Sequence, residues 1–331
     1  MKTSVIIPSH NEGTKINDTI ESLLIHNKYI HEIIIVDDCS STPVEDDIAY
    51  KAELIKVLRL DKNRGVGYAF DRGVDIATGD IIFLMGADIR FNHDAVRDLS
   101  EIAQENPKSL IGCECIGVKD SIEFIKATQH TTNFKSDVIG RKKRLGADLK
   151  WKVTNRDMSA SNPLRIDESY HDILQAKWRK FENAPKELQQ IACILGATYA
   201  VNRDWYTHLK GFEGHRIWGG LEPMISIKSH LAGGDCKVAS NVYTGHIFGR
   251  SPNRKSDLWN MYWNKVYMAQ MFFTGDIKKE LMDHVRVWRP SFAAEKEILD
   301  GWNTTFKDIR EYYRTILKVD VRDTILWETW E

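Results

Sequence analysis

The 331-residue sequence predicts an α/β fold with a mostly parallel central sheet flanked by helices. Short apolar runs such as 81–85 (IIFLM) carry no charge, which is typical of strands buried on both faces of a parallel sheet. Helical patterns separate these runs, and each run ends in a polar loop. This alternation is typical of parallel strands joined by right-handed helical crossovers.

Four strands are expected in the first part of the chain, each followed by polar residues. In chain order the expected elements are a strand at Thr3–Pro8, a helix carrying Ile16, Ile20, Leu23 and Leu24, strands at Glu32–Val36 and Val57–Leu60, a helix from about Tyr68 to Ala77, and a strand at Ile81–Met85. Because ligands in such sheets bind beyond the carboxyl ends of the strands, the loops at these ends are the candidate site. Those loops carry Asn11, Glu12, Asp37, Asp38, Arg64 and Asp88.

The fourth strand ends in two small residues, Gly86 and Ala87, and one carboxylate, Asp88. At the carboxyl end of a buried strand, Asp88 stands where a metal or a phosphate would be held. The alternative is that Asp88 caps the helix that begins near His93 or closes a turn.

Glycine-rich phosphate loops do not occur at the expected places. A dinucleotide-binding fold predicts GxGxxG after the first strand, where this chain has PSHNEG, and no GxxxxGK[ST] is present. A carboxylate at the end of the second strand could accept from a base imide N–H, and a cation at Asp88 could bridge a diphosphate. The pattern therefore favours a nucleotide bound through a metal and side chains.

Composition excludes few partners. The formal net charge is -1 and 28% of residues are charged, so no global positive field indicates nucleic acid, although a local basic patch is possible. The apolar run near the N-terminus is too short for a signal peptide and no apolar run reaches membrane-spanning length, so we expect a soluble, cytoplasmic protein without membrane insertion. The five cysteines lack CxxC spacing, which favours reduced structural thiols.

Three segments resemble one enzyme family. SVIIPSHNE, IIIVDDCSS and KNRGVGYAFDRGVDIATGDIIF, with the acid after the fourth strand, are similar to the nucleotide-sugar-binding half of family 2 glycosyltransferases, which have the GT-A fold. The resemblance implies that Asp37 or Asp38 contacts uracil. It also implies that Asn11 and Glu12 face the uridine and that Arg64 contacts the base or the phosphates. The implied donor-binding set is Pro8, Asn11, Glu12, Asp37, Asp38, Arg64, Gly86, Ala87, Gly219 and Gly220.

The chain departs from this family at one position. Family members usually have Asp-x-Asp where this chain has Gly86-Ala87-Asp88. The resemblance implies that Asp88 is the cation-binding acid, whereas Gly86 replaces the acid associated with the ribose. The cation would then depend more on the diphosphate and on other ligands.

A second block, from Ile194 to Asn253, resembles the second half of polypeptide N-acetylgalactosaminyltransferase catalytic domains. It contains a small-residue strand, a Trp-Gly-Gly helix start and a Gly-His-x-Phe strand end. The resemblance implies that His246 is a metal ligand beside Asp88, and this donor pair favours Mn²⁺, with Mg²⁺ as the alternative. A histidine at a strand end can also be purely structural.

Glu222 follows Trp218-Gly219-Gly220, the loop that in the resembling enzymes lies under the donor sugar. The family's acidic pair falls on 221–222 or on 222–223. A carboxylate base at Glu222 would allow inversion, whereas a sugar contact would favour retention, towards which the two resembling blocks point slightly. The alternative is a first-turn acid favoured by the helix dipole.

The segment after His246 is basic and contains Arg250 and Arg254. In GT-A enzymes a flexible loop at this place often closes over the diphosphate, so Arg250 could neutralise the leaving group; the alternative is a solvated connector. The candidate catalytic residues are thus Glu222, Trp218 and Arg250. From Leu258 onward the pattern is helical and rich in aromatic residues.

The resemblance fails between Gly117 and Lys186, which includes a basic run at 140–152, GRKKRLGADLKWK. This insert could shape the acceptor site, present a solvated face or bind a polyanion. The expected organisation is a GT-A catalytic domain at 1–250, divided into a donor half (1–115), an insert (116–190) and an acceptor and metal half (191–250). A loop and helical extension follow at 251–331.

The sequence thus predicts a metal-dependent glycosyltransferase that moves a hexose or N-acetylhexosamine from a UDP-sugar to an acceptor hydroxyl. The acceptor could be a glycan, a protein or a hydroxymethylated base of phage-type DNA. The alternatives are a non-catalytic module that binds sugar nucleotides or glycans, and a nucleotidyltransferase on a related fold.

Overall fold

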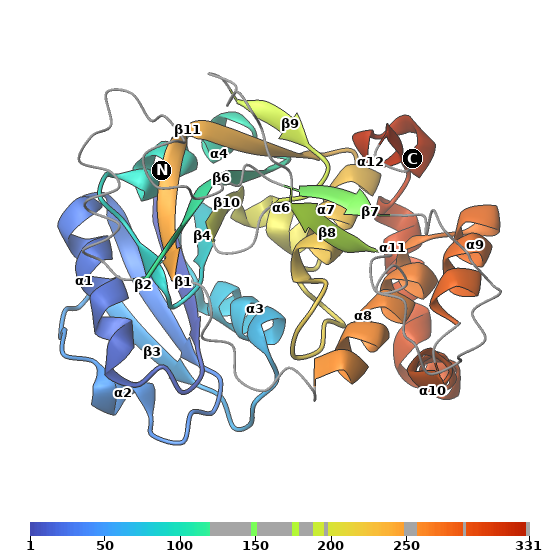
Figure 1. Ribbon diagram of the computed structural model, residues 1–331, viewed down its shortest axis with the longest axis horizontal. Coiled ribbons are helices and arrows are strands. Elements are labelled where there is room, and N and C mark those ends of the chain that lie inside the picture. Colours follow the sequence, from blue (N-terminus) through green and yellow to red (C-terminus); the bar gives the residue numbers. More distant parts are fainter. Residues whose placement is uncertain are drawn as a thin grey trace.

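The computed structural model describes residues 1–119, 147–150, 174–178, 188–194, 198–247, 257–286 and 289–328. Within these ranges the chain forms one nine-stranded sheet, helices on both faces of it and a group of C-terminal helices (Figure 1). A separate two-stranded sheet pairs β7 (Ala147–Lys150) with β8 (Gln175–Trp178).

The large sheet has six strands that run in one direction among the described residues. Its order is β3 (Ile55–Arg59), β2 (Ile30–Asp37), β1 (Thr3–Ser9), β4 (Ile81–Met85), β10 (Thr198–Asn202), β6 (Ser109–Val118), β11 (Asp235–Ile247) and β5 (Ile89–Arg90), and β9 (Gln189–Ile191) pairs with β11. Strands β5, β9 and β10 run against the others. The predicted mostly parallel sheet is confirmed, and the antiparallel strands are the short β5 and, from the second half of the chain, β9 and β10.

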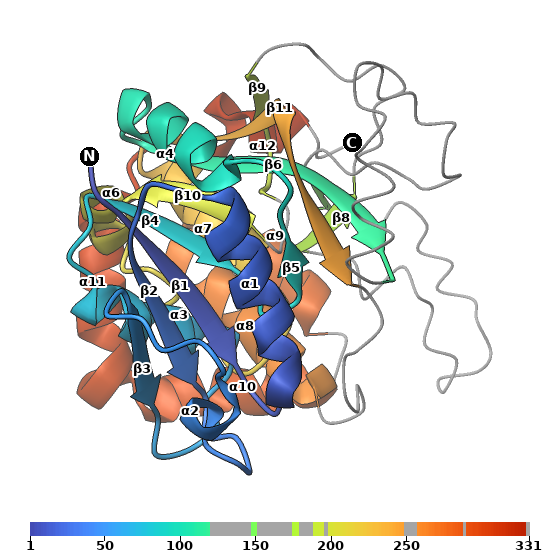
Figure 2. The same ribbon diagram turned by 90° about the vertical axis from the view of Figure 1, so that its left-hand side faces the viewer.

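Both faces of the central strands are buried because helices cover both sides. On one face α1 (Ile16–His26) and α4 (Ala95–Glu105) pack on side chains such as Val5 and Phe83. On the other face α3 (Val66–Ile76), α6 (Arg203–His208) and α7 (Leu221–Leu231) pack on Ile6 and Leu84. The uninterrupted apolar runs therefore follow from a sheet without a solvated face. Figure 2 shows α1 in front of β1, with α3 behind the sheet.

Helix α4 clarifies the role of Asp88. The helix begins at Ala95, and its N-cap is Asp94, whose side chain accepts a hydrogen bond from the backbone N–H of Arg97. Asp94 thus satisfies one of the free N–H groups at the helix start. The alternative that Asp88 caps this helix is wrong.

The C-terminal helices form the predicted helical extension and have their own apolar core. They are α8 (Asp257–Phe272), α9 (Gly275–Val285), α10 (Arg289–Asp300), a π-helical segment (Trp302–Phe306), α11 (Lys307–Ile316) and α12 (Ile325–Glu328). Short helical turns also occur at Gly13–Lys15 (η1), Val44–Asp47 (α2) and Val321–Asp323 (η5). The extension packs on Met224, Ile227 and Leu231 of α7, so α7 lies between the sheet layer and the extension (Figure 1).

A buried charged cluster connects three parts of this fold. The Lys228 ammonium of α7 donates to the carbonyl of Gly211 and lies 3.5 Å from the Tyr313 hydroxyl of α11. On α3, the Asp71 carboxylate accepts from the Tyr206 hydroxyl (2.7 Å) and from the Phe212 N–H (2.9 Å). Burial raises the pKa of Asp71 to about 6 and lowers the pKa of Lys228 to about 8, while the attraction between the two charges opposes both shifts.

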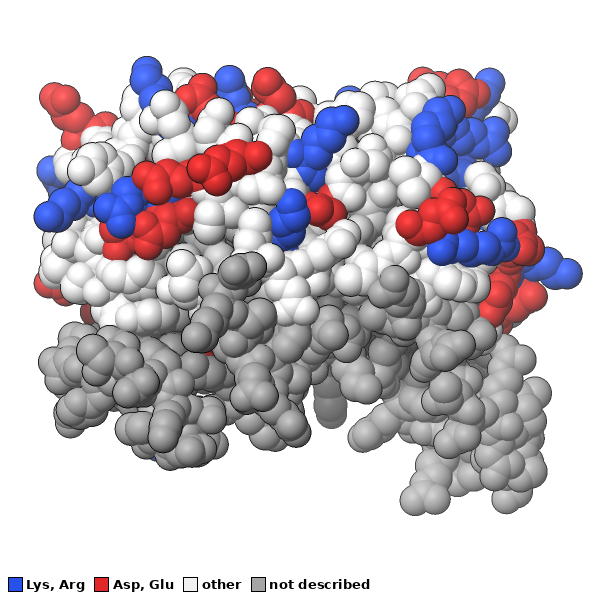
Figure 3. Space-filling model, turned by 90° about the horizontal axis from the view of Figure 1, so that it is seen from above, with Lys and Arg blue, Asp and Glu red and all other residues white. Residues whose placement is uncertain are grey.

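The surface bears charges of both signs. Acidic and basic side chains are intermingled on the described part of the face seen from above (Figure 3), in keeping with the net charge of -1. Among the described residues, the structure contains no helix with the length and apolar character needed to span a membrane.

Replacing Lys228 by Met should destabilise the protein by about 3 kcal/mol, because it leaves the buried Asp71 charge without its cation. A carboxyl whose pKa is raised by folding contributes stability at low pH, and this contribution is lost as the pH rises through the folded pKa. Without Lys228 the pKa of Asp71 should rise further. Urea unfolding should therefore show a larger loss at about pH 8 than at about pH 5.

The matched control is Lys279→Met, because Lys279 is an exposed lysine of the neighbouring α9. This change should alter the free energy of unfolding by less than about 0.5 kcal/mol at both pH values. An equal loss for Lys228→Met at both pH values would contradict the proposed coupling to Asp71.

Candidate functional site

The loops after β1, β2, β3 and β4 lie at one edge of the sheet, because these four strands are parallel neighbours. The structure thereby brings together the loops that carry Asn11, Asp38, Arg64 and Asp88, as the sequence predicts. The second half of the chain adds β11 and the loop before α7 to this region.

Asp88 and His246 meet through backbone pairing between distant segments. The short strand β5 pairs antiparallel with β11, which places His246 opposite Ile89. The Ile247 N–H also donates to the carbonyl of Asp88 (3.2 Å). As a result the Asp88 Oδ2 and His246 Nε2 atoms are 3.3 Å apart, and both side chains are partly exposed, at 28% and 19%.

Two side chains that sequence analysis missed hold the turn before β5. Thr19 of α1 donates its hydroxyl to the carbonyl of Ala87 (2.5 Å). The Arg90 guanidinium donates to the Thr19 hydroxyl (2.6 Å) and forms an ion pair with Asp18 (3.2 Å), and its side chain is 2% exposed. The sequence signal for this interaction is the position of Arg90, a basic residue among the apolar residues Ile89 and Phe91.

The space beside Gly86 is taken by the Asp88 carboxylate. A Cβ atom on Gly86 would lie 2.7 Å from Asp88 Oδ1, closer than such atoms approach in proteins. The side chain of an aspartate at position 86 would therefore require the Asp88 carboxylate to move.

The Asp88 and His246 side chains fit a divalent cation as a pair of neighbouring ligands. Two ligands at right angles around an octahedral ion, with bonds of about 2.1 Å, are about 3.0 Å apart, close to the observed 3.3 Å. Within the described part of the chain, no group of three or more His, Cys, Asp or Glu side chains could hold a metal ion. A bound diphosphate and water could supply further ligands.

Asp37 and Asp38 are neighbours in sequence but accept hydrogen bonds from different loops. Asp37 is fully buried and accepts from the N–H groups of Ser40 (2.8 Å) and Val44 (3.1 Å), and it pairs with Arg59. Although burial alone would raise the pKa of Asp37, these hydrogen bonds and the arginine lower it. Asp37 therefore shapes the loop after β2.

Asp38 organises the loop before α3. Its two carboxylate oxygens accept from the backbone N–H groups of Arg64 (2.8 Å) and Gly65 (2.7 Å), and the residue is 4% exposed. Each carboxylate oxygen has a second lone pair that a ligand could use. The Arg64 guanidinium lies over the Tyr68 ring at 4.8 Å, and its Nε has no hydrogen-bond partner among the described residues.

The loops after β1 and β2 are tied together by Asn11. Its Oδ1 accepts from the Ser41 N–H (2.8 Å), and its own N–H donates to the Ser40 hydroxyl (2.9 Å). Asn11 has φ of +57°, a conformation that asparagine tolerates better than most residues. Glu12 follows as a half-buried residue before η1, and Pro8 lies in β1 opposite Val36.

Gly65 connects the first half of the chain to the loop before α7. It forms a parallel backbone bridge with Ile217, and a Cβ on Gly65 would lie 2.3 Å from the Ile217 Cα. With φ of +92°, Gly65 also has a backbone conformation that other residues rarely adopt. Glycine is thus needed for the close approach of these two loops.

The loop Trp218-Gly219-Gly220 is held by a buried asparagine of α8. The Asn264 amide donates to the carbonyls of Gly219 (2.7 Å), Arg216 (3.0 Å) and Trp218 (3.3 Å). His215 Nε2 also donates to the Gly219 carbonyl (3.1 Å), and burial lowers the pKa of His215 to about 4, so this ring is neutral. The Trp218 side chain, by contrast, is 43% exposed.

Glu222 lies in the first turn of α7, near the Asp88 and His246 pair. Burial of its carboxyl raises its pKa, and the neighbouring His246 partly opposes that shift. Leu221 and Pro223, the two neighbours of Glu222, are both buried, whereas Glu222 is partly exposed. The assignment of the acidic pair to 221–222 or to 222–223 stays open.

Tyr199 of β10 was not predicted and lies close to Glu222. It is 1% exposed, and its hydroxyl has no hydrogen-bond partner among the described residues. Burial raises the pKa of Tyr199, and the carboxylates of Glu222 and Asp71 add to this shift. The sequence offers no signal that separates this tyrosine from a core aromatic residue.

Several predicted residues lie outside the described ranges. These are Arg250 and Arg254 of the loop after His246, and most of the basic run 140–152, of which the backbone of β7 is described.

The sequence is similar to those of polypeptide N-acetylgalactosaminyltransferases. Human polypeptide N-acetylgalactosaminyltransferase 10 is 28% identical over 255 residues, which cover 74% of this chain and 38% of that protein. The aligned region is therefore well under half the length of this curated relative.

Solved structures show the GT-A fold of the chain. The crystal structure of GalNAc-T7 with UDP, GalNAc and Mn²⁺ matches this chain with a TM-score of 0.62 and 16% sequence identity. The match covers 96% of this chain and 55% of the GalNAc-T7 chain. The mannosyltransferase PcManGT from Pyrobaculum calidifontis, with GDP-Man and Mn²⁺, matches at a TM-score of 0.50 and 14% identity, covering 99% of this chain and 87% of the other.

The family model described as "Glycosyl transferase family 2" matches residues 4–174, more than half of the chain. This match begins in β1 and includes the loops that carry Asn11, Asp38, Arg64 and Asp88. The chain belongs to glycosyl transferase family 2.

Proposed function

We propose that this chain transfers a hexose or N-acetylhexosamine from a UDP-sugar to an acceptor hydroxyl, with the help of a divalent cation. The observation that carries the proposal is the Asp88 and His246 pair, which β5 and β11 bring together at the edge where four parallel strands end. A carboxylate and an imidazole together favour Mn²⁺ over Mg²⁺.

A cation bound there would neutralise charge that develops on the departing diphosphate. Side chains at this edge of the sheet would bind and orient the donor. Asp88 and His246 hold the cation, while Asp38 fixes the Arg64 loop so that the Arg64 side chain can reach the base or the phosphates.

Uridine is the proposed base, with Asp38 the better candidate than Asp37 for contact with the uracil. Asp37 is occupied by the N–H groups of Ser40 and Val44 and by Arg59 of β3. Each Asp38 oxygen, by contrast, accepts one hydrogen bond and can accept another. UDP in the GalNAc-T7 structure supports this choice, although the weaker structural match carries GDP-Man. A panel of UDP-sugars and GDP-mannose tests the base directly.

Glu222 is proposed to contact the donor sugar, with retention of the anomeric configuration. It follows Gly219 and Gly220, whose positive φ values allow the backbone to turn beneath a ligand. The similarity of the chain to polypeptide N-acetylgalactosaminyltransferases supports retention. Trp218, with its exposed side chain beside this loop, is proposed to form a wall of the sugar site.

A non-catalytic donor-binding module is the second candidate, because Gly86 replaces an acid that family members carry. Slow hydrolysis of the UDP-sugar in the presence of Mn²⁺ would distinguish an enzyme from such a module. Mass spectrometry of products formed on glycans, proteins and DNA with hydroxymethylated bases would then identify the acceptor.

Replacing Asp88 or His246 by Ala should lower Mn²⁺-dependent transfer or donor hydrolysis by about 100-fold or more, because each change removes a ligand of the cation. Neither residue is in the apolar core, so the melting temperature without ligand should change little. UDP with Mn²⁺ at about 100 times its dissociation constant should stabilise the wild type by about 2.7 kcal/mol, and this effect should shrink in both variants.

The control for this pair is Asp46→Ala, which removes an exposed acid of α2 away from the proposed cation. It should retain both transfer and the stabilisation by UDP and Mn²⁺. A folded Asp88→Ala protein with normal turnover would refute the proposed role of Asp88.

The product sugar should keep the anomeric configuration of the donor, as measured by proton NMR early in the reaction. Glu222→Gln should raise the KM for the donor while the product configuration stays the same. Loss of a general base would instead reduce kcat by about 10² to 10⁴. An inverted product would contradict retention, and inversion with a collapsed kcat would identify Glu222 as the base.

A further inference from the structure

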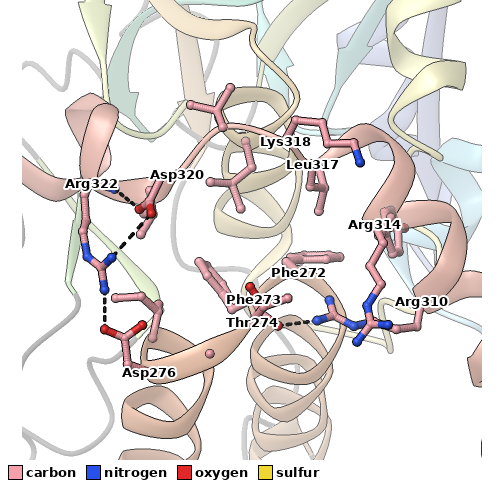
Figure 4. Close-up of a pocket in the computed structure, with 16 residues that line it drawn as sticks. Phe272, Phe273, Thr274, Asp276, Arg310, Arg314, Leu317, Lys318, Asp320 and Arg322 are labelled. Carbon is pink, nitrogen blue, oxygen red and sulfur yellow. Dashed lines mark hydrogen bonds and ion pairs between the residues drawn. The ribbon is translucent and has the colours of Figure 1, made fainter.

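A cavity lies among the C-terminal helices and shares no residue with the candidate site described above. It has a volume of about 250 Å³ and lies where the end of α8, the start of α9, the end of α11 and the segment 317–322 meet. Its lining includes Phe272, Phe273, Leu317 and four basic side chains (Figure 4).

Arg310 is the buried cation of this cavity, at 3% exposed. Its guanidinium donates to the carbonyl of Met271, in the last turn of α8, and to the carbonyl of Phe273, the residue that follows α8. Burial and the neighbouring Arg314 lower the pKa of Arg310 to about 10. Arg310 thus remains charged at neutral pH, held in place by backbone oxygens and not by a carboxylate.

Two more cations lie on the same side of the cavity (Figure 4). Arg314 and Lys318 form no ion pair with a carboxylate among the described residues. The half-buried Lys278 of α9 is close enough that Arg310 and Arg314 help burial to lower its pKa. The nearby acid Glu295 is already bound by Arg286, at 2.6 and 2.9 Å.

On the opposite side of the cavity, one cation lies between two acids. There Arg322 pairs with Asp276 and, at 3.5 Å, with Asp320 (Figure 4). The lining carries four cations and two acids, so its net charge is +2 (4 − 2). Both acids pair with Arg322, and neither forms an ion pair with Arg310, Arg314 or Lys318.

Helix α9 adds a second feature of the same sign. Its first turn, with Thr274 as the N-cap, lines the cavity. No side chain caps this end, so its backbone N–H groups and the positive end of the helix dipole are available. Asp276 in this turn is engaged by Arg322.

We propose that this cavity is a binding site for a phosphate group, separate from the donor site. Arginine side chains bind tetrahedral oxyanions through paired N–H groups, and a helix N-terminus supplies further donors. The shared chemistry is a phosphate with two or more free oxygens, supplied either by a small phosphorylated molecule or by a phospholipid headgroup.

Titration calorimetry with inorganic phosphate, at constant ionic strength set with chloride, tests the proposal on the whole chain. Phosphate should bind the wild type with a millimolar or lower Kd, and the double variant R314Q/K318Q should weaken this binding by about tenfold or more. Both side chains are exposed and outside the proposed catalytic machinery, so the variant should fold.

The matched control is Lys307→Gln, which removes an exposed cation two turns earlier on α11, outside the cavity lining. It should leave the phosphate Kd within about twofold. UDP with Mn²⁺ should stabilise the double variant as it does the wild type, which separates this site from the donor site.

A second arm identifies the source of the phosphate. A lipid source predicts that the wild-type protein cosediments with phosphatidic acid vesicles but not with phosphatidylcholine vesicles. It also predicts that R314Q/K318Q does not cosediment with phosphatidic acid vesicles. Binding of inorganic or sugar phosphate alone would support a small molecule. No binding in either arm, or an unchanged phosphate Kd in the double variant, would overturn the proposal.

Discussion

The contact between Asp88 and His246 depends on one short backbone pairing. Strand β5 consists of Ile89 and Arg90, yet its pairing with β11 brings together side chains that are far apart in the chain. A pairing of two residues is weak alone, so the turn is also held by Thr19 and by the buried Arg90. The proposed cation site thus depends on the turn before β5, which α1 holds in place through Asp18 and Thr19.

Helix α7 couples this site to the rest of the molecule. Its Glu222 interacts electrostatically with His246. Its apolar side chains pack on the sheet layer and on the C-terminal helices, and Lys228 joins the buried charged cluster. The loop before it is fixed by Asn264 and by the bridge to Gly65. The C-terminal extension therefore helps to position the floor of the proposed donor site.

The parallel strands and the polar edge could be predicted from the sequence, because hydrophobic periodicity reports local structure. The pairing of Asp88 with His246 followed from the resemblance of two segments to known glycosyltransferases; the structure places the two side chains 3.3 Å apart, and their role as metal ligands stays a prediction. The backbone bridge between Gly65 and Ile217 joins segments distant in sequence, so no local pattern predicts it. Thr19, Arg90, Asn264 and Tyr199 were missed, because their roles arise from contacts between segments distant in sequence. The antiparallel strands were also missed, since the chain returns to the sheet at β10 after the insert.

The proposed function requires Asp88 and His246 to hold one cation together. Electron paramagnetic resonance of Mn²⁺ bound with UDP, in protein carrying ¹⁵N-labelled histidine, tests it most directly. The structure predicts a hyperfine coupling to one imidazole nitrogen that disappears in His246→Ala, and weaker Mn²⁺ binding in Asp88→Ala. Mn²⁺ bound without nitrogen coupling, or with coupling that survives the loss of His246, would contradict the account.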